Sequence, residues 1–158
     1  ENTLLQFGGH KHAAGMVLQR EKLDEFKIAI NKFADDELTE DMLVREVTID
    51  AVVDLREVAN SIVDYFMLLK KFEPFGPGNY EPVFLSPEAK IFDVKNFGNN
   101  HLKFKIKVDG ITIDAIGYGL GELYQSVGVA DKVSIVFSFD EGNWNGQPVV
   151  QFKIKDLK

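Results

Sequence analysis

The stretch HLKFKIKVDGITIDAIGY, residues His101 to Tyr118, decides the fold of this chain. It contains two segments in which apolar and polar side chains alternate, which is the pattern of half-buried β-strands. Asp109 and Gly110 separate these segments, and Asp-Gly is a strong hairpin signal because glycine tolerates the positive φ of a type I′ turn. The sequence therefore predicts an antiparallel hairpin of strands 101–108 and 111–118.

A two-residue turn also fixes which residues face each other across this hairpin. One face begins with Val108 opposite Ile111 and is apolar throughout, so we expect it to line the protein interior. The opposite face carries these cross-strand pairs: Lys107 with Thr112, Lys105 with Asp114, Lys103 with Ile116, and His101 with Tyr118. The hairpin is therefore expected to present a row of lysines that ends in an imidazole and a phenol ring.

Further strands are predicted at about 89–97, 132–139 and 148–155, with a short helix at 121–127. The resulting order β-β-β-α-β-β is that of the OB-fold, a small five-stranded barrel that binds oligonucleotides and oligosaccharides. Residues 47–55 alternate like one more strand, and apolar residues between 58 and 72 repeat at helical spacing. We therefore predict a mixed α+β fold, mainly an OB-fold barrel with an added strand and helix.

The composition is that of a soluble globular protein, with 45% hydrophobic and 27% charged residues among 158. The absence of cysteine excludes disulfides and thiolate metal sites and is compatible with the cytoplasm, where we expect the protein to reside. No apolar run is long enough to span a membrane, and no signal peptide is visible. The net charge of −7 argues mildly against nucleic acid, unless the bases gather on one face.

The outward-facing row of the hairpin is the first candidate site. The outer face of the second and third strands is the usual ligand surface of an OB-fold. Lysines neutralise phosphates and aromatic rings stack on bases, which favours nucleic-acid binding by these side chains. The candidate residues are His101, Lys103, Lys105, Lys107 and Tyr118. A lysine strand that is merely solvated explains the same pattern, and the acid Asp114 would cancel part of its charge.

The loop DEGNWNGQP, residues 140–148, is a second candidate because it joins the last two strands beside the same surface. It carries Trp144, the only tryptophan, in a polar Asn/Gly context. Stacking of one base on an indole contributes about 1–3 kcal/mol. The alternative for Trp144 is an indole that folds back over the end of the barrel.

Near the N-terminus, residues 7–16 read FGGHKHAAGM. Gly8 and Gly9 would let backbone N–H groups approach an anion, and His10 could add a donor at the start of a short helix. A tight turn between strand and helix is the simpler explanation of the same glycines. Residues 20–38 then carry a helical apolar stripe, so residues 1–36 are expected to form loop, strand and helix. The chain begins with Glu1 rather than methionine, and we expect it to be part of a longer protein.

Three landmarks in the sequence resemble known families. FGGHKHAAG resembles the GGHxxAAG motif of the DHH-associated domain of DHH-family phosphoesterases, and similar strings occur in alanyl-tRNA synthetases. FEPFGPGNYEPVF resembles the PFGxGNPEPxF segment of the RecJ family of single-strand-specific 5′→3′ DNA exonucleases, with Tyr80 where that pattern has proline. The OB region of the same family is resembled by two further segments, HLKFKI and NWNGQPVVQFKIKDL. The three landmarks occur in the same order along this chain as in the RecJ family, and the resemblance covers nearly the whole chain.

The resemblance implies a division into three parts: residues 1–36 as the C-terminal fragment of a DHH-associated domain, 37–46 as a connection, and 47–158 as an OB-fold nucleic-acid-binding domain. It implies that Gly8, Gly9 and His10 contact phosphate. It further implies single-stranded DNA as the partner, a role in DNA repair and recombination beside other repair proteins, and Mn²⁺ or Mg²⁺ in the full-length hydrolase.

The chain lacks the residues for metal-dependent hydrolysis, since it has no Asp-His-His and only the histidines His10, His12 and His101. We therefore expect no cofactor in this chain, and we expect it to bind DNA while a DHH domain elsewhere in the same protein cuts it. Two alternatives stay open. One is an OB module for protein interaction, and the other is part of a small-nucleotide DHH phosphodiesterase, which would resemble only residues 1–36.

Overall fold

The structure, a computed structural model, describes residues 3–11, 13–44, 46–127, 132–144 and 146–158, and of residues 126 and 144 only the backbone. The chain separates into two compact units, Glu1–Glu46 and Val47–Lys158.

The first unit is a β-hairpin followed by helices. Strands β1 (Leu4–His10) and β2 (Ala13–Leu18) pair antiparallel, and a short 3-10 turn, η1 (Arg20–Lys22), leads into α1 (Leu23–Glu37) and α2 (Glu40–Leu43). The helix is as predicted. The N-terminal segment that was expected to be a loop forms strand β1. The short helix expected after His10 is wrong, because the small residues from Ala13 onward pair with β1 as a second strand. No described residue of this unit is buried, so it encloses no core of its own.

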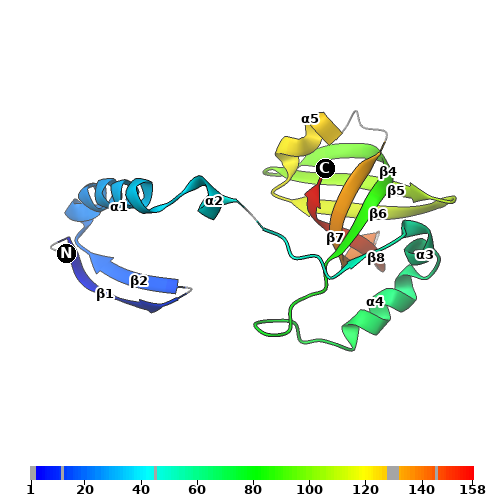
Figure 1. Cartoon of the computed structure of the whole chain (residues 1–158), viewed down its shortest axis with the longest axis horizontal. Helices are drawn as coiled ribbons and strands as arrows, with labels where there is room; N and C mark the ends of the chain where they lie inside the picture. The colour runs from blue at the N-terminus through cyan, green and yellow to red at the C-terminus, as the bar shows by residue number, and fades with distance from the viewer. Residues whose placement is uncertain (1–2, 12, 45, 128–131, 145) are drawn as a thin grey trace. The chain divides into compact units, whose positions relative to one another are not determined.

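The second unit is a closed barrel of five strands (Figure 1). The strands are β4 (Phe84–Phe97), β5 (His101–Val108), β6 (Ile111–Tyr118), β7 (Val133–Trp144) and β8 (Gln147–Leu157). They follow the order β4-β5-β6-β8-β7, and β7 pairs back onto β4 to close the barrel. Strand β4 takes part in both pairings, since its first half pairs with β7 and its second half with β5. The predicted OB-fold is confirmed.

The segment before the barrel differs in detail from the prediction. Of the strand expected over residues 47–55, only β3 (Ala51–Val52) forms, parallel to β4. The strand ends early because Asp54 caps the next helix, its side chain accepting a hydrogen bond from the backbone N–H of Arg56. The single helix expected over residues 58–72 is two helices, α3 (Leu55–Asn60) and α4 (Ile62–Lys70), separated at Ser61 by its non-helical backbone.

Two short segments shape the remaining connections. The PFGPGN segment forms a tight turn in which Gly76 and Asn79 exchange backbone hydrogen bonds, and the Asn79 amide donates to the carbonyls of Phe72 and Pro74. This turn ends the α4 region and leads into β4. Between β6 and β7, the predicted short helix appears as η2 (Gly121–Leu123) and α5 (Tyr124–Val127). Helices α3 and α5 lie at opposite ends of the barrel (Figure 1).

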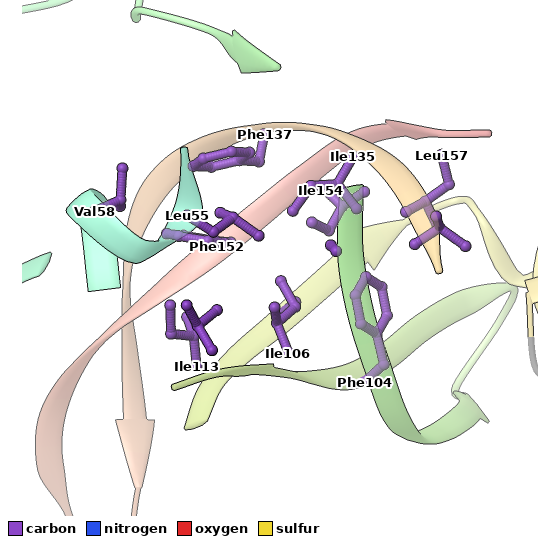
Figure 2. Packing of buried hydrophobic residues seen from close by; sticks show 14 of the residues in the cluster. Leu55, Val58, Phe104, Ile106, Ile113, Ile135, Phe137, Phe152, Ile154 and Leu157 are labelled. Carbon is purple, nitrogen blue, oxygen red and sulfur yellow. The ribbon is translucent and has the colours of Figure 1, made fainter. Parts of the chain in front are cut away.

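The core fills the barrel interior with side chains from every strand. Its largest fully buried members are Phe104, Phe137 and Phe152. The rings of Phe137 and Phe152 stack with centroids 4.0 Å apart. Leu55 and Val58 of α3 are also buried and reach this cluster from one end of the barrel (Figure 2). Helix α3 is therefore fixed to the barrel by apolar packing.

Candidate nucleic-acid interface

The β5–β6 hairpin has the register that its sequence predicts. Asp109 and Gly110 take φ values of 45° and 87°, the left-handed conformation that a type I′ turn requires. Val108 pairs with Ile111, and Lys105 pairs with Asp114. On the inner face, Leu102, Phe104, Ile106 and Ala115 are completely buried. Because side chains alternate along a strand, every lysine of β5 is directed to the outer face.

The far end of this outer face carries an aromatic cluster. The ring of His101 lies edge-on to Phe97, with centroids 5.5 Å apart, and edge-on to Tyr118, with centroids 5.4 Å apart. Tyr118 is 52% exposed and Phe97 is 40% exposed, so both rings offer surface to a ligand. The structure thus brings together the lysines of β5 and the two ring-bearing residues predicted beside them.

Strand β4 adds residues that the sequence analysis missed. It pairs Lys90 with Lys107, Phe92 with Lys105, Lys95 with Lys103, and Phe97 with His101. An irregularity between Phe92 and Lys95, with Asp93 at a φ of 53°, shifts the register by one residue. This shift keeps Lys95 and Phe97 on the outer face, although simple alternation from Lys90 would place them inside.

We call this surface the lysine face and define it by its outward residues on β4, β5 and β6. Its members are Lys90, Phe92, Lys95 and Phe97 of β4, His101, Lys103, Lys105 and Lys107 of β5, and Thr112, Asp114, Ile116 and Tyr118 of β6. Lysines outnumber acids on it, in contrast to the chain as a whole, whose net charge is −7.

The lysine face places like charges opposite each other. Lys90 faces Lys107 and Lys95 faces Lys103, in cross-strand pairs whose Cβ atoms lie about 5 Å apart. Like charges in this arrangement destabilise a sheet. Lys95 is partly compensated by Asp93, whose carboxylate lies 2.7 Å from its Nζ. Among the described residues, Lys90 and Lys107 form no ion pair.

The carboxyl group of Asp93 reports the positive potential of this surface. Its pKa lies below the ordinary value, first because Lys95 donates a hydrogen bond to it and further because the charges of Lys95, Lys105 and Lys103 favour the ionised form. Burial opposes these effects. Lys95 contributes most to this lowering of the pKa, and Lys105 and Lys103 add smaller contributions of the same sign.

His101 is held in place by a hydrogen bond from the residue that follows β6. Its Nδ1 accepts a hydrogen bond from the backbone N–H of Gly119 at 3.1 Å. The neighbouring Asn100 has a φ of 66°, and its carbonyl accepts from the backbone N–H of Gly121 at 3.2 Å. With Nδ1 engaged as an acceptor, Nε2 of the neutral ring carries the proton and is available as a donor.

The remaining predicted residues lie elsewhere. Trp144 ends β7, but its side chain falls outside the described part of the structure, as does all of His12. Gly8, Gly9 and His10 belong to the first unit, at the end of β1. A Cβ at Gly9 would lie 2.4 Å from the carbonyl oxygen of Ala13, so this glycine is required by the close approach of the two hairpin strands.

Within the described residues, no three or more His, Cys, Asp or Glu side chains are grouped so that they could hold a metal ion. No helix in the described ranges combines the length and the apolar character needed to cross a membrane.

Comparisons with known proteins agree with this geometry. The model of the RecJ OB domain family matches residues 49–156. The single-stranded-DNA-specific exonuclease RecJ of Bacillus subtilis is 33% identical over 98% of this chain, and that of Thermus thermophilus is 32% identical over 100% of it. This chain spans only 20% and 22% of those relatives.

A solved structure shows the same arrangement of elements. The crystal structure of Thermus thermophilus RecJ in complex with Mg²⁺ superposes with a TM-score of 0.62 and 26% identity, covering 99% of this chain and 23% of that one. A second structure of the same protein, in complex with Mn²⁺, gives the same TM-score. Since the family model covers well over half of the sequence, the chain belongs to the RecJ OB domain family.

Proposed function

We propose that residues 47–158 bind single-stranded DNA on the lysine face, as the DNA-binding part of a RecJ-type 5′→3′ exonuclease that acts in DNA repair and recombination. The observation that supports this proposal most directly is the hairpin register, which directs Lys103, Lys105 and Lys107 outward beside the rings of His101 and Tyr118. Lysines and aromatic rings together are what sequence-tolerant binding of single strands requires.

In this proposal, phosphates lie along the lysines and one or two bases stack at the aromatic end. Alternate residues of a strand are about 6.8 Å apart, so the lysines of β5 form an evenly spaced row. A bound phosphate would relieve the repulsion between Lys90 and Lys107, which face each other without an ion pair among the described residues. The protein without DNA folds in spite of the repulsion between these two lysines, and bound DNA would remove that repulsion.

The chemistry of cleavage is assigned to another part of a longer protein. The described residues offer no cluster for the Mg²⁺ or Mn²⁺ named in the Thermus structures. We therefore propose that a DHH domain of the same protein holds the metal. Residues 1–36 would complete a DHH-associated domain in which Gly8, Gly9 and His10 contact phosphate, residues 37–46 would connect it to the OB domain, and the whole enzyme would work in the cytoplasm.

The comparisons disfavour a small-nucleotide phosphodiesterase. The RecJ relatives match across the barrel as well as across residues 1–36, covering 98% and 100% of this chain.

The test is equilibrium binding of the 158-residue chain to a fluorescent oligothymidylate, with a duplex of the same length as the comparison. We expect preferential binding of the single strand, with an affinity that falls as salt rises by a log–log slope of about −0.7 for each phosphate neutralised. Equal affinity for duplex, or no binding at low salt, would contradict the proposal and favour an OB module for protein interaction.

A further inference from the structure

A second feature of the OB unit lies at the hairpin end of the barrel. A pocket of about 680 Å³ opens between the Asp109–Gly110 turn, the first half of β4 and the start of α3. This volume is within the range of small-molecule sites in proteins. Lys90 and Lys107 line the pocket and also belong to the lysine face, so the pocket is continuous with that surface.

The pocket joins these lysines with a guanidinium from another element. Arg56 lines it from α3, and the helix is anchored because its neighbours Leu55 and Val58 are buried in the core. The backbone of Arg56 is further fixed by the Asp54 side chain, whose Oδ1 accepts from its N–H at 2.8 Å. Within the described residues, Arg56, Lys90 and Lys107 form no ion pair.

Acids also line the pocket, but two of the three have other roles. Glu88 forms an ion pair with Lys132, and Asp54 caps α3. Asp109 occupies the first position of the hairpin turn at a φ of 45°. With Lys132 included, four cations and three acids line the pocket, so its lining carries a net charge of +1, and two of its lysines lie opposite each other across β4 and β5.

We propose that this pocket binds a phosphate group of the DNA strand that lies on the lysine face, with Arg56, Lys90 and Lys107 as its ligands. The inference rests on the proposed function and extends it past the end of the sheet. Arginine presents a planar fork of donors that matches two phosphate oxygens, and lysine adds a point charge. A single phosphate placed there would offset the repulsion of the lysine pair.

The experiment compares Arg56→Ala, Arg56→Lys and the control Lys71→Ala with the unmodified chain. Lys71 follows α4, is exposed, and lines neither the pocket nor the lysine face. Salt series are measured with oligothymidylate that carries a phosphate at the 5′ end, at the 3′ end or at neither end, and with inorganic phosphate as competitor. Thermal unfolding verifies that the variants fold, which we expect because the Arg56 side chain is exposed.

For Arg56→Ala we expect the log–log salt slope to become shallower by at most about 0.7, the contribution of one phosphate, because Lys90 and Lys107 remain in the pocket. Arg56→Lys should retain most of the slope, and Lys71→Ala all of it. A loss seen with every strand identifies an internal phosphodiester, whereas a loss seen only with phosphorylated ends identifies a terminal phosphate; both support the pocket. If the unmodified chain binds single strands and Arg56→Ala matches Lys71→Ala, the pocket assignment is wrong although the lysine face stands. If the unmodified chain does not bind at all, both proposals fail.

Discussion

The lysines of β5 supply the most quantitative prediction. Replacing Lys103, Lys105 and Lys107 by alanine removes three evenly spaced charges from one strand without touching the buried face. If each lysine neutralises one phosphate, the salt slope should become shallower by about 2.1, since each contact to a single strand contributes about 0.7. Between 50 and 200 mM salt, the affinity of the unmodified chain should then fall about 20-fold more than that of the variant. Fluorescence anisotropy with labelled oligothymidylate measures both slopes.

A matched control distinguishes the arrangement of these lysines from net charge alone. The triple change Lys32→Ala, Lys71→Ala and Lys158→Ala removes the same charge from residues outside the lysine face, and it should leave the slope unchanged. The face variant should unfold at an unchanged or higher urea concentration, because like charges opposite each other destabilise a sheet. Equal slopes for the two triple variants would refute the assignment of phosphates to β5.

Four further predictions concern single features of the chain. Tyr118→Ala should weaken single-strand binding by about 1–3 kcal/mol while leaving the salt slope intact, since stacking involves no counterion release; calorimetric titration at two salt concentrations decides this. Gly110→Ala should lower the free energy of unfolding by about 1–2 kcal/mol, because alanine disfavours the φ of 87° found there, and urea denaturation that shows no loss would count against the turn assignment. The fluorescence of Trp144, the only tryptophan, should change on saturation with an oligonucleotide, and an unchanged emission spectrum would remove Trp144 from the site. The purified chain should release no nucleotides from single-stranded DNA with Mn²⁺ or Mg²⁺, and turnover above that of a mock purification would show that cleavage needs no further domain.

The hairpin was predictable because its signals are local. Asp109-Gly110 specifies the turn, the turn specifies the register, and alternation then assigns every side chain to a face. Two patterns, strand periodicity and turn chemistry, agreed on the same structure. The order of strands and helix that is typical of the OB-fold followed from this hairpin and from the strands predicted on either side of it.

The contribution of β4 was not predictable from alternation. The shift at Asp93 adds one residue between Phe92 and Lys95, and only pairing with β5 reveals which residues then face outward. The positive φ at Asp93 is compatible with an aspartate, which tolerates the left-handed region better than most residues. An aspartate within a strand sequence, here Asp93, is a weak indication of a β-bulge, and it does not identify one unless the pairing with the neighbouring strand is known.

The N-terminal glycines show how one motif supports two structures. Gly8 and Gly9 were compatible with a turn into a helix, but the small residues that follow pair with β1 instead. Strand pairing with another segment decides such cases, and helical propensity alone does not. Likewise, the pocket depends on α3 packing against the end of the barrel, which brings Arg56 near Lys107 although 50 residues separate them in sequence.

The most direct test of the central proposal is to map the DNA contacts of the lysine face by amide chemical-shift changes. The ¹⁵N-labelled chain is titrated with oligothymidylate, and shifts are assigned residue by residue. We expect the largest chemical-shift changes on residues 101–107, with further changes on residues 90–97 and around Tyr118, and only small changes for the buried residues of the barrel. Saturable shifts confined to other surfaces of the barrel, with residues 101–107 unaffected, would contradict it.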